Sequence, residues 1–391
     1  MSFVVELGSS RTPIDLEVFK MLFENSVVRR YASYTKALQT GTITFSELIK
    51  LSRQAAIPYP LFFAPIPVVK AQINLKVKKL YQGASKQTYS LNSRSKVKLT
   101  DVELIYRDLG RKQELVKKFD PTLKQNVILG MLAKSKNELA FDAQRLLSAL
   151  GLTTAQIHAA KNKAVALELL IAHLEAAQIL VSRSVNGYMP QTLSKVRLSG
   201  LTVKDQKVPY IFLAGGSHDE DEEPEGRQIF TTTLLAVLVA RDIFAPVTMD
   251  ARATVAAPSA EYDLVSEILM PSDLLPSQDL STLEQVRTAS SFFKVTPSAL
   301  VVRAMRLQLL ERKAAHIYLD ELAEAFRTRR SSRRRAPKPV NAIRKYNGRE
   351  FSRRMISAMD QGHMTPAELC RSVCAGKISV GDIPEFRNAL Q

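Results

Sequence analysis

The chain has 391 residues, 46% of them hydrophobic, and carries 55 Lys and Arg against 38 Asp and Glu, a formal net charge of +17. The apolar content excludes a wholly disordered chain and predicts a globular protein with roughly two or three cores. The positive charge favours a polyanionic partner, nucleic acid first and an anionic membrane surface second.

The two cysteines, Cys370 and Cys374, are too few for a disulfide framework and favour a reducing compartment. Their i,i+4 spacing could supply half of a metal site, but no Cys-rich or His-rich stretch completes it. No apolar run reaches the roughly 18–20 residues that a membrane span needs, and Met1–Thr12 lacks a signal-peptide pattern. We therefore expect a cytoplasmic protein with no membrane span, no metal and no cofactor.

Residues 1–70 are predicted to form a small helical module. Apolar side chains recur at helical spacing over Asp15–Leu38, and Thr44 with Glu47 makes a capping box for a helix through about Ala56. Prolines then end the module. Plain helix packing explains this pattern, and so does a degenerate helix-turn-helix of the repressor type.

Residues 71–152 are predicted to be a connector and a helical arm. Ala71–Leu99 is rich in Lys, Ser and Thr, which favours a long connector or a short exposed hairpin. Asp108 and Lys112 are opposite charges four residues apart, which suits a solvent-facing helix. Helices are expected over Thr100–Phe119, Asp120–Ser135 and Glu138–Leu150.

The pattern of residues 153–275 changes from helix to strand and back. Thr153–Gln178 predicts one long helix, capped by Thr153 or Thr154. Three short β-branched or aromatic segments then predict a three-stranded sheet: Ile179–Val185, Val196–Val203 and Pro209–Ala214. The remaining segments are the acidic loop Asp219–Glu225, the apolar helix Gln228–Arg241, the loop Ala245–Ala260 and the helix Glu261–Met270. The expected fold class is α+β, predominantly helical.

Residues 276–326 are predicted to be a helical segment resembling a helix-turn-helix. Leu283–Phe293 and Pro297–Leu310 are joined by a short turn, and Pro297 suits the first helical position. In that arrangement Arg303 and Arg306 are expected to face outward. Glu311–Phe326 continues as helix. Beyond it we expect a basic linker over residues 327–347 and a C-terminal helical unit over residues 348–391, with helices at Gly348–Gln361 and Thr365–Ala375.

The segment Arg327–Arg335 is the most basic stretch of the chain. It is either a solvated linker or a contact to nucleic acid. No aromatic residue is interleaved with it, so phosphate contact is favoured over stacking on bases. The candidate nucleic-acid-binding residues are Arg303, Arg306, Arg327, Arg329, Arg330, Arg333, Arg334, Arg335 and Lys338.

Four segments have an order and spacing that can be compared with those of known families: His173–Val185, Leu198–Leu213, Arg227–Thr231 and Ser266–Pro271. This order resembles the ImmA/IrrE metallopeptidases of phages, integrative elements and toxin–antitoxin loci. The resemblance implies a small zincin-like core over residues 153–275, flanked by N-terminal and C-terminal helical modules.

The chain departs from that family where the chemistry would lie. The family's zinc site uses H-E-x-x-H on one helix, in which two imidazoles bind Zn²⁺ and a carboxylate activates water. The matching positions are Leu234, Leu235 and Leu238, and the third ligand falls near Ala260, beside Glu261. Leucine offers no lone pair and accepts no proton. The resemblance therefore implies a pseudo-metallopeptidase without catalytic residues.

Three functions remain open at this stage. The first is a non-catalytic regulatory or binding protein of a phage or mobile element that contacts nucleic acid or a repressor or antitoxin-type protein. The second is an active metallopeptidase with an unrecognised site, for instance Glu261 with His218 and Asp219. The third is a structural subunit that docks a protein through the acidic tract Asp219–Glu225 or the C-terminal helices. The sequence does not distinguish repressor, anti-repressor and defence roles, and it leaves the oligomeric state open.

Overall fold

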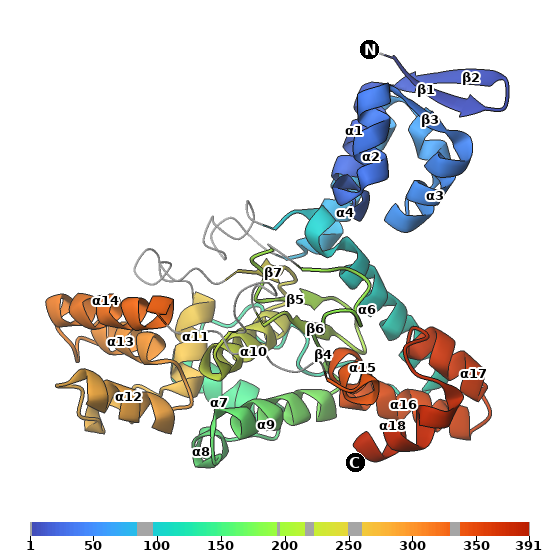
Figure 1. Ribbon diagram of the computed structural model, residues 1–391. Helices are drawn as coiled ribbons and strands as arrows, with labels where there is room; N and C mark the ends of the chain where they lie inside the picture. Colours follow the sequence, from blue (N-terminus) through green and yellow to red (C-terminus); the bar gives the residue numbers. More distant parts are fainter. Residues whose placement is uncertain are drawn as a thin grey trace.

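The structure is a computed structural model that describes residues 2–83, 97–193, 196–215, 223–248, 260–328 and 337–390. It is a mixed α/β protein, mostly helical, with two small sheets. An N-terminal lobe stands on a central sheet with its helices, while one group of helices lies on each side of that centre (Figure 1). Among the described residues, no helix is both long and apolar enough to cross a membrane.

The N-terminal lobe contains strands as well as helices, so the prediction of an all-helical module is wrong. Strands β1 and β2 form a hairpin, and β3 pairs in parallel with β1 to give the order β2-β1-β3. Thr44 caps α3 by accepting from the Glu47 N–H, as predicted. The elements are β1 Ser2–Leu7, β2 Ser10–Asp15, α1 Leu16–Glu24, α2 Ala32–Thr40, β3 Thr42–Thr44 and α3 Phe45–Ala55.

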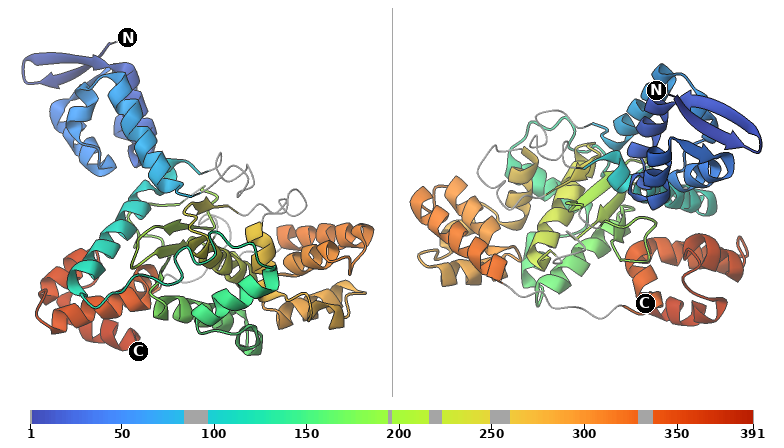
Figure 2. Two further views of the ribbon diagram at one scale, coloured as in Figure 1. Left: turned by 180° about the vertical axis from the view of Figure 1, so that it is seen from behind. Right: turned by 45° about the horizontal axis from the view of Figure 1, so that its top comes forward.

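Two helices join this lobe to the centre. Helix α4 (Ile66–Leu80) occupies the first part of the predicted connector, which is therefore helical there, while residues 84–96 lie outside the described part. Helix α6 (Leu99–Phe119) matches the predicted helix within a residue. It runs from beneath the N-terminal lobe to the C-terminal helices, as Figure 2 shows from behind.

The next segment is less helical than its periodicity suggests. Residues 120–135 form turns, not the predicted helix. Helix α7 (Leu139–Ala149) is confirmed and ends before Gly151, which has a φ of 64°. The predicted long helix is broken into α8 (Thr154–Ala159) and α9 (Lys163–Ala176), because Asn162 takes an extended conformation and caps α9.

The central sheet contains the three predicted strands and one more. Strand β6 (Tyr210–Leu213) pairs in parallel with β4 (Leu180–Arg183) and antiparallel with β5 (Gly200–Val203). The short β7 (Pro246–Val247) extends the edge next to β5, inside a segment predicted to be a loop. The order is β4-β6-β5-β7.

Alternate side chains of this sheet enter two different cores. Ile211 and Leu213 of β6 lie in the core formed with α9 and α10, whereas Tyr210 and Phe212 lie in the core formed with α6 and the C-terminal helices. The sheet is therefore covered on both faces, as its run of buried residues requires. The N-terminal lobe has a third, separate core.

The remaining helices follow the predicted order, with corrections at the end. Residues 339–347, assigned to a linker, form a helix, and the predicted C-terminal unit contains one further helix. The elements are α10 Glu225–Ala240, α11 Ala260–Leu269, α12 Leu283–Phe292, α13 Pro297–Arg306, α14 Arg312–Thr328, α15 Pro339–Asn347, α16 Arg349–Asp360, α17 Pro366–Glu368 and α18 Ile383–Ala389. A single π-helical turn, Leu369–Val373, continues α17.

Candidate functional site

Helix α10 lies at the centre of the molecule, where the resemblance places the zinc-binding helix. It begins after Pro224, and every residue from Gln228 to Ala240 is buried. A helix that is apolar on all sides belongs in a core. Its threonines satisfy their hydroxyls within the helix: Thr232 and Thr233 donate to the carbonyls of Gln228 and Ile229. The prediction of a buried helix is confirmed.

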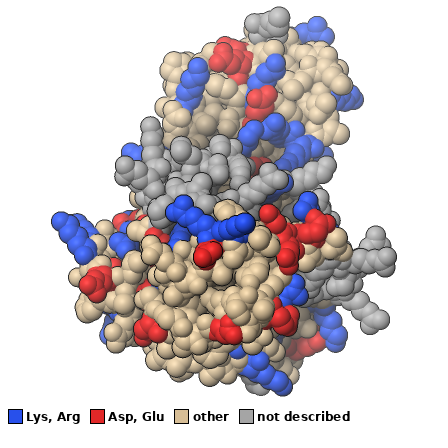
Figure 3. All heavy atoms as spheres, turned by 90° about the vertical axis from the view of Figure 1, so that its left-hand side faces the viewer, with Lys and Arg blue, Asp and Glu red and all other residues tan. Residues whose placement is uncertain are grey.

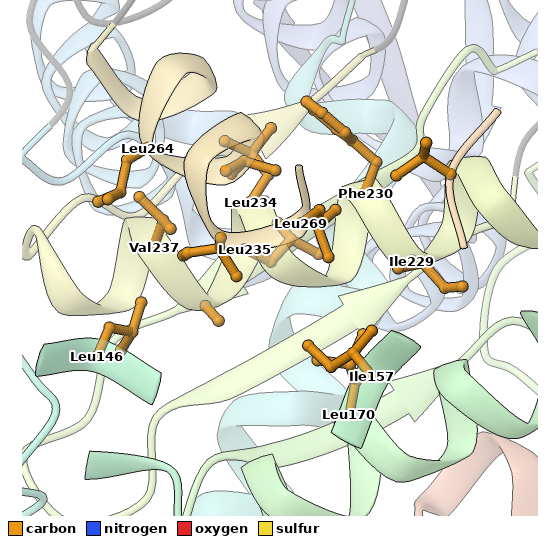
Figure 4. Close-up of a cluster of buried hydrophobic side chains, with 14 of the residues drawn as sticks. Leu146, Ile157, Leu170, Ile229, Phe230, Leu234, Leu235, Val237, Leu264 and Leu269 are labelled. Atoms are coloured by element: carbon orange, nitrogen blue, oxygen red, sulfur yellow. The ribbon is translucent and has the colours of Figure 1, made fainter. Parts of the chain in front are cut away.

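The three leucines that the resemblance assigns to the H-E-x-x-H positions lie in this core. Leu234, Leu235 and Leu238 are each 0% exposed. Figure 4 shows Leu234 and Leu235 in one apolar cluster with Leu264 and Leu269 of α11. Leu235 also approaches the sheet so closely that a Cβ on Gly200 would lie 2.6 Å from its Cδ1. No space remains there for a metal and its water.

The third ligand position offers no better chemistry. Ala260 is the exposed first residue of α11, while Glu261 is 8% exposed. Its neighbour Tyr262 packs near Phe230, with ring centroids 6.0 Å apart, and burial raises the pKa of Tyr262 to about 12. Within the described residues no group of three or more His, Cys, Asp or Glu side chains could hold a metal ion. The residues at these positions therefore do not fit zinc.

The histidines nearest α10 have structural roles. His158 Nε2 bonds the carbonyl of Leu269 at 2.8 Å, and burial lowers its pKa. His173 Nδ1 bonds the carbonyl of Leu150 at 2.9 Å. Each ring nitrogen thus connects its helix to the end of another helical segment.

The acidic tract lies mostly outside the described residues, together with His218 and Asp219 of the alternative catalytic site. Glu223 is described, and it is buried against the sheet, where it accepts from the Ser199 hydroxyl at 2.8 Å. Burial raises its pKa. Glu225 opens the first turn of α10, where a negative charge is favourable.

Arg303 does not face outward, so that prediction is wrong for Arg303, whereas Arg306 is half-buried with a side chain 27% exposed. Arg303 is 5% exposed, and its guanidinium pairs with Glu267 of α11 and donates to the carbonyl of Met270. Arg306 Nη1 pairs with Asp263 at 2.8 Å. The two helices of the predicted helix-turn-helix do form, with Thr296 as N-cap and Pro297 in the first turn. Arg303 and Arg306, however, form ion pairs that connect α13 to α11.

The surface of this helical segment is not basic. Over residues 283–328 the exposed charged side chains are five acidic and four basic: Glu284, Glu311, Asp320, Glu321 and Glu324 against Arg287, Arg312, Lys313 and Arg327. Figure 3 shows this side of the molecule, where both signs are scattered over a largely uncharged surface. Such a face has no excess positive charge to attract phosphates.

The other candidate basic residues lie around the described ends of the basic segment. Arg327 is exposed and pairs with Glu324 at 2.6 Å. Lys338 is also exposed, 3.7 Å from Glu385. The remaining candidates lie outside the described residues: Arg329, Arg330, Arg333, Arg334 and Arg335.

A buried ion pair on α6 escaped the sequence analysis. Lys112 is 0% exposed, so it does not face solvent as predicted. Its Nζ lies 3.3 Å from Asp108 and 3.8 Å from the Tyr346 ring centroid, while Tyr346 Oη donates to Asp108 at 2.6 Å. Burial alone would raise the pKa of Asp108, but Lys112 and Arg111 hold it at about 2. Lys112 continues the apolar stripe of Ile105 and Leu109, a signal that could have placed it inside.

A second buried carboxyl connects α9 to α16. Glu175, at the end of α9, is 5% exposed and accepts from the backbone N–H of Glu350 at 3.2 Å. It thereby caps the first turn of α16, which has no side-chain cap of its own. Burial raises the pKa of Glu175 to about 7.

The two cysteines lie in the C-terminal unit and are both buried and unpaired. Burial raises the pKa of Cys374 to about 12, so its thiol is not a reactive nucleophile at neutral pH.

Comparison with models of known protein families, with curated proteins and with solved structures finds no significant match for the chain.

Proposed function

We propose that this chain is a non-catalytic pseudo-metallopeptidase that serves as a regulatory or binding protein of a phage or mobile element and contacts nucleic acid. Its scaffold is a degenerate zincin-like core over residues 153–275. The observation that carries the proposal is the complete burial of Leu234, Leu235 and Leu238 on α10. The order of helix α9, strands β4, β5 and β6, then helices α10 and α11 supports it, because the resemblance implies that order.

The proposed partner follows from charge. The chain carries a net charge of +17, yet the exposed charges of α12 to α14 nearly balance. The contact is therefore assigned to the basic segment that begins with Arg327, in the last turn of α14, and extends to Lys338. The two unpaired cysteines support action in a reducing, cytoplasmic compartment.

Two measurements on the purified full-length chain test this proposal. We expect binding to a short labelled DNA duplex that weakens steeply with salt, and zinc far below one atom per chain by elemental analysis. Stoichiometric zinc together with chelator-sensitive peptidase activity would contradict the non-catalytic assignment. Absence of salt-dependent binding to any duplex or single strand would contradict the nucleic-acid assignment.

A second candidate function is docking of a protein partner, such as a repressor or antitoxin-type protein, on the α12 to α14 side. The observation that favours it is a set of exposed large apolar side chains there: Phe292 45%, Leu309 39%, Ile317 50% and Phe326 43%. Exposed large apolar side chains on these helices offer apolar surface to a protein partner. This candidate would be favoured if one protein co-purifies with the wild type in the absence of nucleic acid. The double variant Ile317→Asp with Phe326→Asp should then lose that protein.

A further inference from the structure

The solvent-facing side of α6 carries a regular line of charged residues. Arg107, Arg111, Glu114 and Lys118 are exposed and follow one another at i, i+4, i+7 and i+11. They therefore share one face of the helix. The opposite face is buried in the central core.

Each half of this line is tied to a different part of the molecule. Arg107 Nη1 donates to the carbonyl of Ala56 at 3.1 Å, at the end of α3, where Arg53 is exposed. Arg111 Nη1 donates to the carbonyl of Ser372 at 2.6 Å, next to the exposed Arg371. Helix α6 runs from the N-terminal lobe to the C-terminal unit (Figures 1 and 2), and it contacts both through these two arginines.

The negative charges along this line are largely compensated. Glu114 pairs with Lys117 at 2.7 Å, and Asp108 pairs with Arg111 and the buried Lys112. Glu368 is the nearby carboxylate influenced by Lys118 and Arg371, and it is engaged in the cap of α17. Within the described part of the chain, Arg53, Arg107, Lys118 and Arg371 form no ion pair. We call these four residues the basic face.

We infer that the basic face binds the phosphate backbone of duplex DNA. This inference rests on the proposed nucleic-acid-binding function and names the surface and the form of the nucleic acid. From Arg107 to Lys118 the helix rises about 16 Å, a length over which duplex DNA carries about ten phosphate charges. The exposed positions of α6 between them carry no aromatic side chain, so they offer no stacking platform for unpaired bases.

The test compares two triple variants of the full chain. The first, Arg53→Gln with Arg107→Gln and Lys118→Gln, removes three charges of the basic face. The control, Lys134→Gln with Lys136→Gln and Arg145→Gln, removes three exposed charges on another surface. Binding to a labelled 20-base-pair duplex is measured across a salt series. The first variant should lower the slope of log K against log salt by about 3, and the control by less than about 1.

The outcomes separate this inference from the proposed function. Equal slopes for the two variants, with the wild type still binding, would overturn the inference alone. A wild type that binds no nucleic acid would overturn the proposed function. Tighter binding to single strands than to duplex would overturn the choice of duplex. If the first variant unfolds, the double variant Arg53→Lys with Arg107→Lys replaces it, because it keeps both charges. We expect this variant to bind the duplex. Loss of duplex binding in a folded Lys variant would contradict phosphate contact.

Discussion

Arg303 of α13 and Glu267 of α11 form an ion pair with side chains only 6% and 8% exposed. The pair lies on the inner side of the predicted helix-turn-helix, where it joins that segment to the helix next to α10. Because both charges are withdrawn from solvent, neither is available to a phosphate. The pair therefore connects α13 to α11, and it offers no charge to an anionic ligand.

Removing one member of this pair leaves a buried charge without its partner. We expect Arg303→Ala to lower the free energy of unfolding by about 3–5 kcal/mol, while the exposed Arg287→Ala changes it by less than about 0.5 kcal/mol. Urea unfolding measures both. The salt slope of DNA binding should be unchanged in Arg303→Ala below its unfolding transition. Normal stability with lost DNA binding would restore the outward-facing assignment.

The resemblance assigns Leu235 to the position of the catalytic glutamate, and a carboxylate there would be buried in an apolar core. We expect Leu235→Glu to destabilise the protein by more than about 4 kcal/mol. Leu309→Glu, at a position 39% exposed, is the matched control and should be nearly neutral. Thermal unfolding distinguishes them. A stable Leu235→Glu variant would indicate an open site beside α10.

Glu175 should make stability depend on pH. Its pKa is raised from 4.5 to about 7, so between these values the folded chain holds a proton that the unfolded chain has lost. The contribution of Glu175 to the free energy of unfolding is therefore largest below pH 4.5. It declines by about 3 kcal/mol as the pH rises toward 7. Glu175→Gln should lack this decline and exceed the wild type above pH 7.

Urea unfolding at a series of pH values gives the free energy of unfolding of Glu175→Gln and of the wild type. Taking the difference between the two cancels the titration of the other carboxyls. Glu114→Gln, whose parent side chain is 74% exposed, serves as control and should follow the wild type. A constant difference between Glu175→Gln and wild type across this range would mean that Glu175 is ionised throughout.

Asp108 and Lys112 should be energetically coupled because each compensates the other in the core between α6 and the C-terminal unit. Asp108→Asn leaves a buried ammonium, and Lys112→Met takes one cation from a buried carboxylate. We expect the double variant to lose about 1–3 kcal/mol less than the sum of the single losses. Additive losses in urea unfolding would show that the pair does not interact.

Much of the secondary structure could be predicted from local pattern. Thr44 before α3 and Thr153 before α8 are N-caps as predicted, because capping depends on neighbouring residues alone. The strand segments of the central sheet and the apolar α10 were also predicted, since their periodicity and composition are local. The strands of the N-terminal lobe were missed because pairing in a hairpin and with the distant β3 stabilises them.

The sequence by itself determined that α10 is buried, because its apolar run contains no ionisable side chain that would favour exposure to water. Which basic residues are free was decided only by the tertiary structure. Arg303 occupies an ordinary position on an amphipathic helix, and its burial depends on Glu267, which another helix supplies. The stripe with Ile105 and Leu109 indicates that Lys112 is buried, but its partner Tyr346 comes from another helix. Long-range packing sets the dielectric environment and the partners of a charge, so the separation of structural from exposed basic residues follows from the fold.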